Sequence, residues 1–363
     1  MMSIFTRNFL KKNLESWRNL TFQSKMKTKH EVSSTREKLL AEYIAPTKID
    51  DEKITIVGLG QVGIATAFSI LSQNISNHIA LVDLNENKLQ GEVLDLKHGC
   101  LFMGNCHVEA CTDYSGTANS KICIITAGLS IGKGETRLSL VQKNTDIFKK
   151  LLPELVKYSP NTMLLIVTNP VDVMTYVSWR ISGLAQCKVI GTGTNLDTSR
   201  FRFLLSQKFG VATSSCHAYI IGEHGDSSVP VWSSVDIAGV RLRDINPYAG
   251  TDKDTENWSD IHKQVINSAY QIIKLKGDTS FAIGLSTAAI AKSMLKNPIN
   301  FHAVSINAKG FHGIQDDVYL SLPCLLNANG LSKIIRERLD DGERLQLQKS
   351  AEILGKVQSS VHF

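Results

Sequence analysis

The chain of 363 residues has no apolar run approaching the roughly 18 residues that are needed to span a bilayer. Its seven cysteines include no Cys-x-x-Cys pair, and no other motif predicts a metal site. Their odd number and mostly apolar surroundings favour reduced core thiols over disulfides, and therefore a reducing compartment. Internal repeats and low-complexity segments are also missing. What remains is the composition of a globular protein, with 43% hydrophobic and 20% charged residues and enough length for two domains.

The charge is distributed unevenly along the chain. The formal net charge is +6, and residues 1–30 alone hold seven basic residues and one acid, so the rest of the chain is balanced. A nucleic-acid-binding domain would instead carry a basic face, often with interleaved aromatic side chains. We therefore expect neither nucleic acid nor a membrane as a partner.

A basic N-terminal extension covers residues 1–34. Leu10, Leu14 and Trp17 follow helical spacing within it, as in a mitochondrial transit peptide. The alternative is a disordered basic tail, because Ile4 and Lys12 interrupt the amphipathic stripe. We expect a cytoplasmic protein, with mitochondrial import as the alternative.

Apolar, β-rich runs alternate with helical patterns in the next part of the chain. This order predicts an α/β fold, a Rossmann-type doubly wound parallel sheet in residues 51–191 with helices on both faces. A second, α+β domain with longer helices is expected over residues 192–363. The expected strands are 53–57, 79–82, 122–126, 164–167 and a strand region 301–322; the expected helices are 35–43, 63–73, 138–158, 172–182, 198–209, 258–274, 283–295 and 332–357.

A glycine-rich turn follows the first expected strand and begins a helix. It reads Gly58-Leu59-Gly60-Gln61-Val62-Gly63, and Asp83 ends the next strand twenty residues later. Glycines let a pyrophosphate approach the backbone at the helix N-terminus, and the acid accepts hydrogen bonds from the adenosine ribose. A carboxylate here would repel a 2′-phosphate, so NAD is expected rather than NADP. The alternative is a glycine turn that binds no ligand.

Two further turns are expected at the same edge of the sheet. The first is Thr126-Ala127-Gly128, followed by a loop with glycines and Arg137, a candidate lid whose arginine could polarise a carbonyl. Arg137 could equally cap the helix that follows. The second contains Asn169, whose amide could orient both a nicotinamide and a substrate, or only support the turn before Pro170.

His224 is the candidate acid–base residue. A nearby carboxylate makes a histidine a better base, and Asp197 could supply it. Arg200 lies three residues further on, on the same helix face, and its planar guanidinium suits a substrate carboxylate. Taken alone, a histidine between glycines is more often a loop residue, and an Asp–Arg pair at this spacing is more often a solvated surface contact.

Together these motifs resemble the NAD-dependent L-lactate dehydrogenases of animals, over residues 35–360. The resemblance rests on GLGQVG (58–63), ALVDL (80–84), TAG (126–128), GETRLSLVQKN (134–144), TNPVD (168–172), NLDTSRFRFL (195–204) and GEHGDSSVPVWS (222–233). It implies interconversion of lactate and pyruvate, as in glycolysis, and a homotetramer in which residues 35–50 form an arm around a neighbouring subunit. An extended N-terminus is similar to that of testis-associated paralogues in this family.

The resemblance also assigns roles to individual residues. It implies that His224 donates and accepts the proton, that Asp197 orients it and that Arg200 binds the substrate carboxylate. It further implies that Arg137 polarises the carbonyl, that Asn169 assists and that Thr279 lines the pocket.

The lid departs from the family pattern. Leu129-Ser130-Ile131 stands where Ala-Arg-Gln is usual, Asp278 stands where a tyrosine is common, and Phe281 replaces a tryptophan. Ile131 favours a larger apolar side chain on the substrate, so 2-oxobutyrate or a branched 2-oxo acid is an alternative to pyruvate. Malate dehydrogenase activity is less expected, because Ile131 offers no charge for a second carboxylate. A slow, NAD-binding assembly partner of active paralogues is the alternative from another class.

Overall fold

The computed structural model describes residues 52–129, 137–298 and 300–363, and of Arg137 only the main chain. The N-terminal extension, the expected oligomerisation arm and the expected helix 35–43 lie outside these residues. So do Ser130, Ile131 and the glycines of the expected lid.

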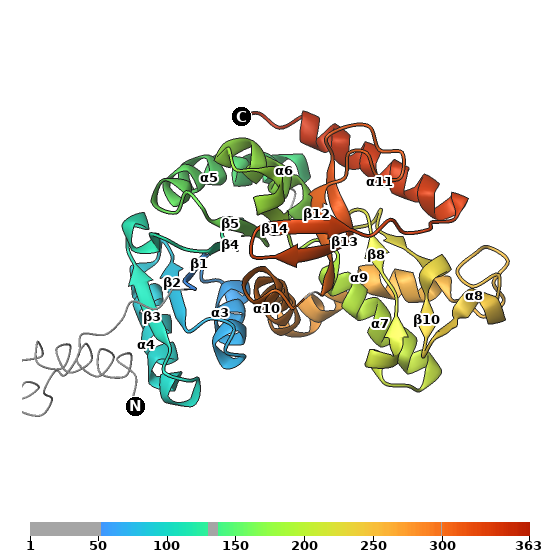
Figure 1. Ribbon diagram of the computed structural model, residues 1–363, viewed down its shortest axis with the longest axis horizontal. Helices are drawn as coiled ribbons and strands as arrows, with labels where there is room; N and C mark the ends of the chain where they lie inside the picture. The colour runs from blue at the N-terminus through green and yellow to red at the C-terminus, as the bar shows by residue number, and fades with distance from the viewer. Residues whose placement is uncertain (1–51, 130–136, 299) are drawn as a thin grey trace, which may run out of the picture. The chain divides into compact units, whose positions relative to one another are not determined.

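One nine-stranded sheet forms the centre of the molecule (Figure 1). Its strand order is β14-β13-β12-β6-β5-β4-β1-β2-β3. The pairs from β6 to β3 are parallel, and the order reverses on either side of β1, as in dinucleotide-binding folds. These parallel strands are β1 (Ile54–Val57), β2 (His78–Val82), β3 (His107–Cys111), β4 (Ile122–Ile125), β5 (Met163–Ile166) and β6 (Val189–Gly191). Most of their residues are buried, because helices cover both faces.

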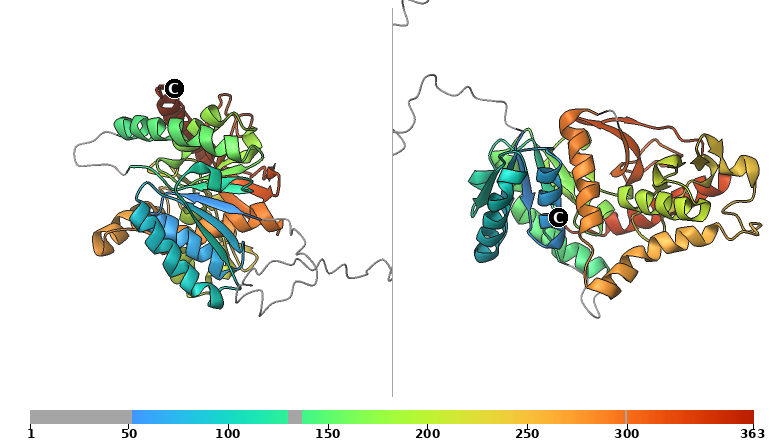
Figure 2. Two further views of the ribbon diagram at one scale, coloured as in Figure 1. Left: turned by 90° about the vertical axis from the view of Figure 1, so that its left-hand side faces the viewer. Right: turned by 90° about the horizontal axis from the view of Figure 1, so that it is seen from below.

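Helices lie on both faces of the sheet. In Figures 1 and 2, α5 and α6 lie on one side, and α3, α4 and α10 lie on the other. The bounds are α3 (Gln61–Ser72), α4 (Glu86–Gly99), α5 (Arg137–Tyr158), α6 (Val171–Ser182) and α10 (Phe281–Lys296). Helices α3 and α10 pack closely at Gly284, where a Cβ would lie 2.7 Å from the backbone of Ala65.

The antiparallel strands of the C-terminal half extend the same sheet. They are β12 (Phe301–Asn307), β13 (Tyr319–Asn327) and β14 (Gly330–Ile334), and β12 joins β6 through Ser305 and Gly191. A second apolar core lies away from the sheet, where α7 packs on α9 around Phe201, Trp232 and Trp258. The remaining α-helices and strands of this half are α7 (Asn195–Phe209), β7 (Cys216–His217), β8 (Ile220–Ile221), β9 (Val229–Pro230), β10 (Asp236–Ile237), β11 (Val240–Arg241), α8 (Leu242–Ile245), α9 (Ser259–Lys276) and α11 (Asp341–Ser359).

The predicted α/β fold is confirmed, and two expectations are wrong. The last helix does not begin at Ser332, because Leu331, Lys333 and Ile334 pair with β13. It begins at Asp341, where Asp340 and Glu343 form a reciprocal capping box.

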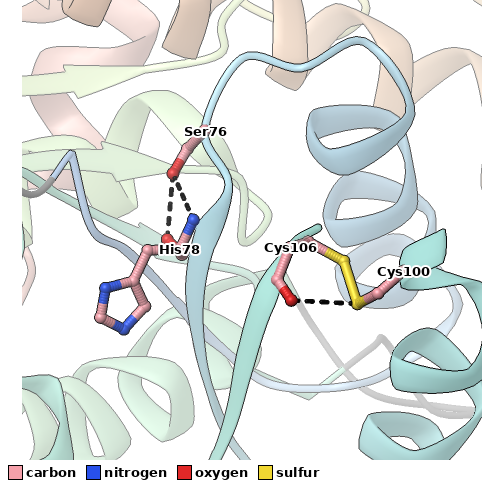
Figure 3. The surroundings of a disulfide bond; sticks show 4 residues. All are labelled: Ser76, His78, Cys100 and Cys106. Carbon is pink, nitrogen blue, oxygen red and sulfur yellow. Dashed lines mark hydrogen bonds between the residues drawn. A yellow bond between two sulfur atoms is a disulfide. The ribbon is translucent and has the colours of Figure 1, made fainter. Parts of the chain in front are cut away.

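The second wrong expectation concerns the cysteines. Cys100 and Cys106 form a disulfide, shown in Figure 3, because a short 3-10 turn brings their Cα atoms to 5.2 Å. The expectation of reduced core thiols holds only for the other five cysteines: Cys111, Cys123, Cys216 and Cys324 are buried, and Cys187 is partly buried.

No helix within the described ranges is both long enough and apolar enough to cross a membrane.

Candidate active site

The glycine-rich turn brings β1, α3 and β4 into close contact. Gly58 has φ +96°, and a Cβ on it would lie 2.6 Å from the backbone nitrogen of Ala127. A Cβ on Gly63 would lie 1.9 Å from the carbonyl oxygen of Gly58, so both positions require glycine. Gly60, by contrast, is the N-cap residue of α3, and a Cβ on it would have no neighbour within 4 Å. The open space beside Gly60 therefore adjoins a helix N-terminus, where a pyrophosphate fits.

Asp83 lies directly after β2, at the same sheet edge. One carboxylate oxygen accepts a hydrogen bond from the N–H of Leu59 at 2.6 Å, and the other accepts one from Asn85 at 2.9 Å. A carboxylate can accept about four hydrogen bonds, so Asp83 is oriented and still has capacity for ribose hydroxyls. Gln61, which is exposed, and Val62, which is half-buried, begin α3 beside this turn.

Asn144 of α5 connects the two other turns at this edge. Its fully buried amide accepts a hydrogen bond from the N–H of Leu129 at 2.8 Å and donates one to the carbonyl of Asn169 at 3.0 Å. Thr168 adds a bond from its hydroxyl to the carbonyl of Ala127 at 2.8 Å. The predicted turns 126–128 and 168–170 are thus held together, and Asn169 itself is exposed at the edge. The sequence reasoning missed Asn144, although it stands in the quoted motif 134–144.

His224, Asp197 and Arg200 are brought together as predicted. Asp197 and Arg200 lie on α7, and His224 lies in the loop between β8 and β9. The Nδ1 atom of His224 is 2.5 Å from one oxygen of Asp197, and Arg200 donates to the other oxygen at 2.9 Å. The Asp197 side chain is only 8% exposed, so this is not the solvated surface pair of the alternative interpretation.

The pKa values of His224 and Asp197 are shifted in opposite directions, and each shift favours the charged form. The charge of Asp197 raises the pKa of His224 above its usual value, despite the opposing effect of burial. Burial alone would raise the pKa of Asp197, but the charges and hydrogen bonds of His224 and Arg200 outweigh it and lower that pKa. The site therefore favours an imidazolium beside a carboxylate, with Nε2 as the nitrogen left to exchange a proton with a substrate.

Two further groups near His224 were not singled out by the sequence reasoning. Asp172 at the start of α6 accepts a hydrogen bond from the backbone N–H of His224 at 2.7 Å. The Nε2 atom of His262 on α9 lies 3.0 Å from the hydroxyl of Ser228, and burial lowers the pKa of this histidine to about 4. His262 is therefore neutral at cellular pH, which leaves His224 as the titrating histidine of this pair.

The remaining predicted residues are placed only in part. Thr279 is half-buried in the connection between α9 and α10. The Arg137 main chain begins α5, and its side chain lies outside the described residues. That the side chains of Thr279 and Arg137 lie beside His224 therefore stays a prediction.

Comparisons with known proteins show the family to which the chain belongs. The family model of the lactate/malate dehydrogenase NAD binding domain matches residues 52–191, and that of the lactate/malate dehydrogenase alpha/beta C-terminal domain matches residues 194–362. The chain is 51% identical over 330 residues to the L-lactate dehydrogenase B chain of Gallus gallus, which covers 91% of this chain and 99% of that protein. The B chain of Bos taurus is 52% identical and that of Homo sapiens 51% identical, each over 331 residues with the same coverage. The glycine turn, Asp83 and the His224–Asp197 pair are therefore features of a chain that belongs to the NAD-binding lactate/malate dehydrogenase family.

Proposed function

We propose that this protein is an NAD-dependent L-lactate dehydrogenase that interconverts L-lactate and pyruvate. The observation that carries the proposal is the buried arrangement in which Asp197 binds His224 through one oxygen and Arg200 through the other. It places a proton donor beside a guanidinium, as a small 2-oxo acid requires. The names of the relatives, which are L-lactate dehydrogenase B chains, support the same substrate pair.

Each residue of the site has a separate task. NAD, when bound, would supply the nicotinamide ring that accepts the hydride from C2 of lactate. Asp197 holds the His224 ring so that Nε2 faces the substrate, and it stabilises the imidazolium that forms when lactate loses its hydroxyl proton. Arg200 fixes the carboxylate of the substrate. Asn169 and Arg137 polarise the C2 oxygen, and Thr279 lines the pocket.

The test is steady-state NADH oxidation by the full chain, with pyruvate, 2-oxobutyrate, a branched 2-oxo acid and oxaloacetate as parallel substrates. We expect the highest kcat/KM with pyruvate, and a loss of at least ~10²-fold in His224→Gln. His217→Gln is the matched control, because His217 is exposed on β7. A better rate with a bulkier acid would replace pyruvate as the substrate. Unchanged turnover in His224→Gln would refute the mechanism, and no turnover of any acid would favour an NAD-binding assembly partner.

We further propose a homotetramer. Large apolar side chains are exposed on the packed helices α3 and α10: Phe68 is 55% exposed, Phe281 75% and Leu285 54%. Exposed apolar groups on adjacent helices are typical of an assembly surface. Sedimentation velocity of the full chain should give a tetramer, and Phe68→Glu should shift it to smaller species; a wild-type monomer would refute the proposal.

For location, we propose the cytoplasm, with import into mitochondria through the basic residues 1–34 as the alternative. A C-terminal fluorescent fusion of the full chain distinguishes the two, because mitochondrial fluorescence would contradict the cytoplasmic proposal.

A further inference from the structure

A cluster of metal-ligating side chains lies at the opposite end of the strands from the glycine turn. His78 is the first residue of β2, His107 is the first residue of β3, and the two are partners in the parallel register. Glu109 is two residues further along β3, so it points to the same face as His107. Its partner on β2 is Ala80, whose small side chain leaves room for the carboxylate to reach both rings.

The three side chains converge on one oxygen atom. The Nε2 atoms of His78 and His107 lie 2.9 Å and 2.6 Å from the same oxygen, Oε1 of Glu109. All three ligand atoms lie within 4.8 Å of one another, and the rings meet edge to face with centroids 4.6 Å apart. A single carboxylate oxygen that accepts two imidazole N–H groups is a position where one cation could replace two protons.

Lys53 occupies the other oxygen of Glu109. Its ammonium lies 3.3 Å from Oε2 and 2.5 Å from the carbonyl of Gly116, and its side chain is only 9% exposed. Oε1 is therefore the oxygen of Glu109 that faces the two imidazoles and is available to a cation.

The backbone around the cluster is held in place on both strands. The N–H of His78 donates to the Ser76 hydroxyl at 3.1 Å, and that hydroxyl lies 2.8 Å from the carbonyl of Glu52. Cys106, which directly precedes His107, is tied to Cys100 by the disulfide (Figure 3). Strand β3 therefore enters the sheet at a fixed position, and the ligands need little reorganisation.

From this geometry we infer that His78, His107 and Glu109 form a binding site for a divalent transition metal ion, with Zn²⁺ as the best match. Two imidazoles and one carboxylate are typical zinc ligands, and tetrahedral bonds of ~2.0–2.1 Å place ligand atoms roughly 3.3 Å apart. The two distances from the imidazole nitrogens to Oε1 of Glu109, 2.9 Å and 2.6 Å, lie within about 1 Å of this value. The His107 side chain is 64% exposed, which gives solvent access to the ion and leaves a fourth position for water.

The position and charge of the site determine what the ion does. It would join β3, the edge strand of the sheet, to β2, at the strand ends opposite the glycine turn that would bind the coenzyme. The role is therefore structural rather than catalytic. The nearby Lys53 charge opposes a cation, so we expect weaker binding than at an all-anionic site.

The test is calorimetric titration of the chelator-stripped full chain with ZnCl₂. Four variants accompany the wild type: His107→Gln and Glu109→Gln remove ligands, His217→Gln is an exposed control, and His224→Gln removes the candidate active-site histidine. We expect one zinc ion to bind per chain. The zinc affinity should fall at least ~10-fold in the two ligand variants and stay unchanged in the other two. A second readout is the melting temperature, which zinc should raise in the wild type but not in His107→Gln.

The outcomes separate this site from the proposed activity. Pyruvate reduction should be unchanged in metal-free His107→Gln, which also shows that the variant folds. Equal zinc affinity in the wild type, His107→Gln and Glu109→Gln would overturn the inference. Loss of zinc binding in His224→Gln alone would also overturn it, because the ion would then belong to the candidate active site.

Discussion

Asp172 accepts a hydrogen bond from the backbone N–H of His224 through one oxygen, while its other oxygen is buried and has no hydrogen-bond partner among the described residues. Burial raises the pKa of Asp172 to about 6, against the lowering effects of the His224 bond and of the nearby Ser305 hydroxyl. The hydroxyl lies close enough to affect the carboxylate but outside hydrogen-bond geometry. A second acid thus supports His224 from the backbone side, at a cost to stability.

Asp172→Asn should stabilise the protein at alkaline pH. An acid whose pKa is raised on folding binds its proton more tightly in the folded state, so its contribution to stability is lost as the pH rises from about 3.8 to about 6. The neutral amide avoids this loss and still accepts the His224 N–H. We expect a gain of about 1–3 kcal/mol at pH 8 that shrinks by roughly 1–2 kcal/mol at pH 5. Denaturation at both pH values checks this, and a difference independent of pH would contradict it.

Asp197→Asn should move the pH profile of pyruvate reduction. The protonated His224 is the donor, and the Asp197 charge raises its pKa. Without that charge the alkaline fall of kcat/KM should shift to lower pH, and the rate should drop by about 10²–10⁴-fold. Asp260→Asn is the control, because Asp260 is exposed on α9. An unshifted alkaline limb would argue against His224 as the titrating group.

The His224–Asp197 pair also contributes to the free energy of unfolding in a pH-dependent way, with an alkaline limit set by His224 and an acid limit set by Asp197. The pKa of His224 is raised on folding, so its contribution is complete below pH 6.5 and is lost as the pH rises through the folded value. The pKa of Asp197 is lowered, so its contribution is present above pH 3.8 and is lost as the pH falls through the folded value. In Asp197→Asn, a plot of the free energy of unfolding against pH should therefore lose both the alkaline decrease due to His224 and the acid decrease due to Asp197.

Asn144→Ala should weaken coenzyme binding and stability together. The change leaves the partly buried N–H of Leu129 and carbonyl of Asn169 without their partner, at about 0.5–1.5 kcal/mol for each group. We expect a higher KM for NADH, because the turns at Leu129 and Asn169 lose their connection. Asn161→Ala on the surface is the control. A destabilised variant with an unchanged KM would limit Asn144 to a structural role.

Two glycines in helices should respond to alanine with opposite signs. Gly91 of α4 is exposed with no neighbour near a Cβ, so Gly91→Ala should stabilise by about 0.5–1 kcal/mol through helix propensity. Gly284→Ala would place a methyl group 2.7 Å from the backbone of Ala65, and should cost about 1–3 kcal/mol. Thermal melts of the two variants check this. An increase in melting temperature in both would contradict the prediction, because it would mean that α3 and α10 can move apart to accept the methyl group.

Removal of the disulfide should lower the free energy of unfolding by about 2 kcal/mol, because the bridge closes a short loop between Cys100 and Cys106. Cys100→Ser with Cys106→Ser, compared with Cys187→Ser, isolates the effect. A reductant should destabilise the wild type and leave the double variant unchanged; equal sensitivity of both would show that the bridge does not form.

The sequence allowed prediction of features with strong local patterns. The apolar run 122–126 predicted a strand, which is present as β4 (Ile122–Ile125), and the glycine turn with Asp83 predicted both the sheet edge and the coenzyme. Long-range pairing was harder to foresee. Leu331–Ile334 pairs with β13, which overrides the local preference for helix, although Asp340 and Glu343 already carried the capping signal. Similarly, the roles of Asn144 and Asp172 depend on contacts with segments distant in the sequence. The Cys100–Cys106 bond is local, but it depends on the 3-10 turn between the two residues, which their spacing alone does not reveal.

The junction between β6 and β12 has a consequence for how the chain folds during synthesis. Gly191 of β6 pairs with Ser305, about 110 residues later. Until that segment leaves the ribosome, the NAD-binding half presents an open strand edge with unpaired N–H and carbonyl groups, to which other chains can add. Nascent chains that stop before β12 should therefore aggregate or require a chaperone, and the dinucleotide-binding half should mature only after its C-terminal partner strand has been made.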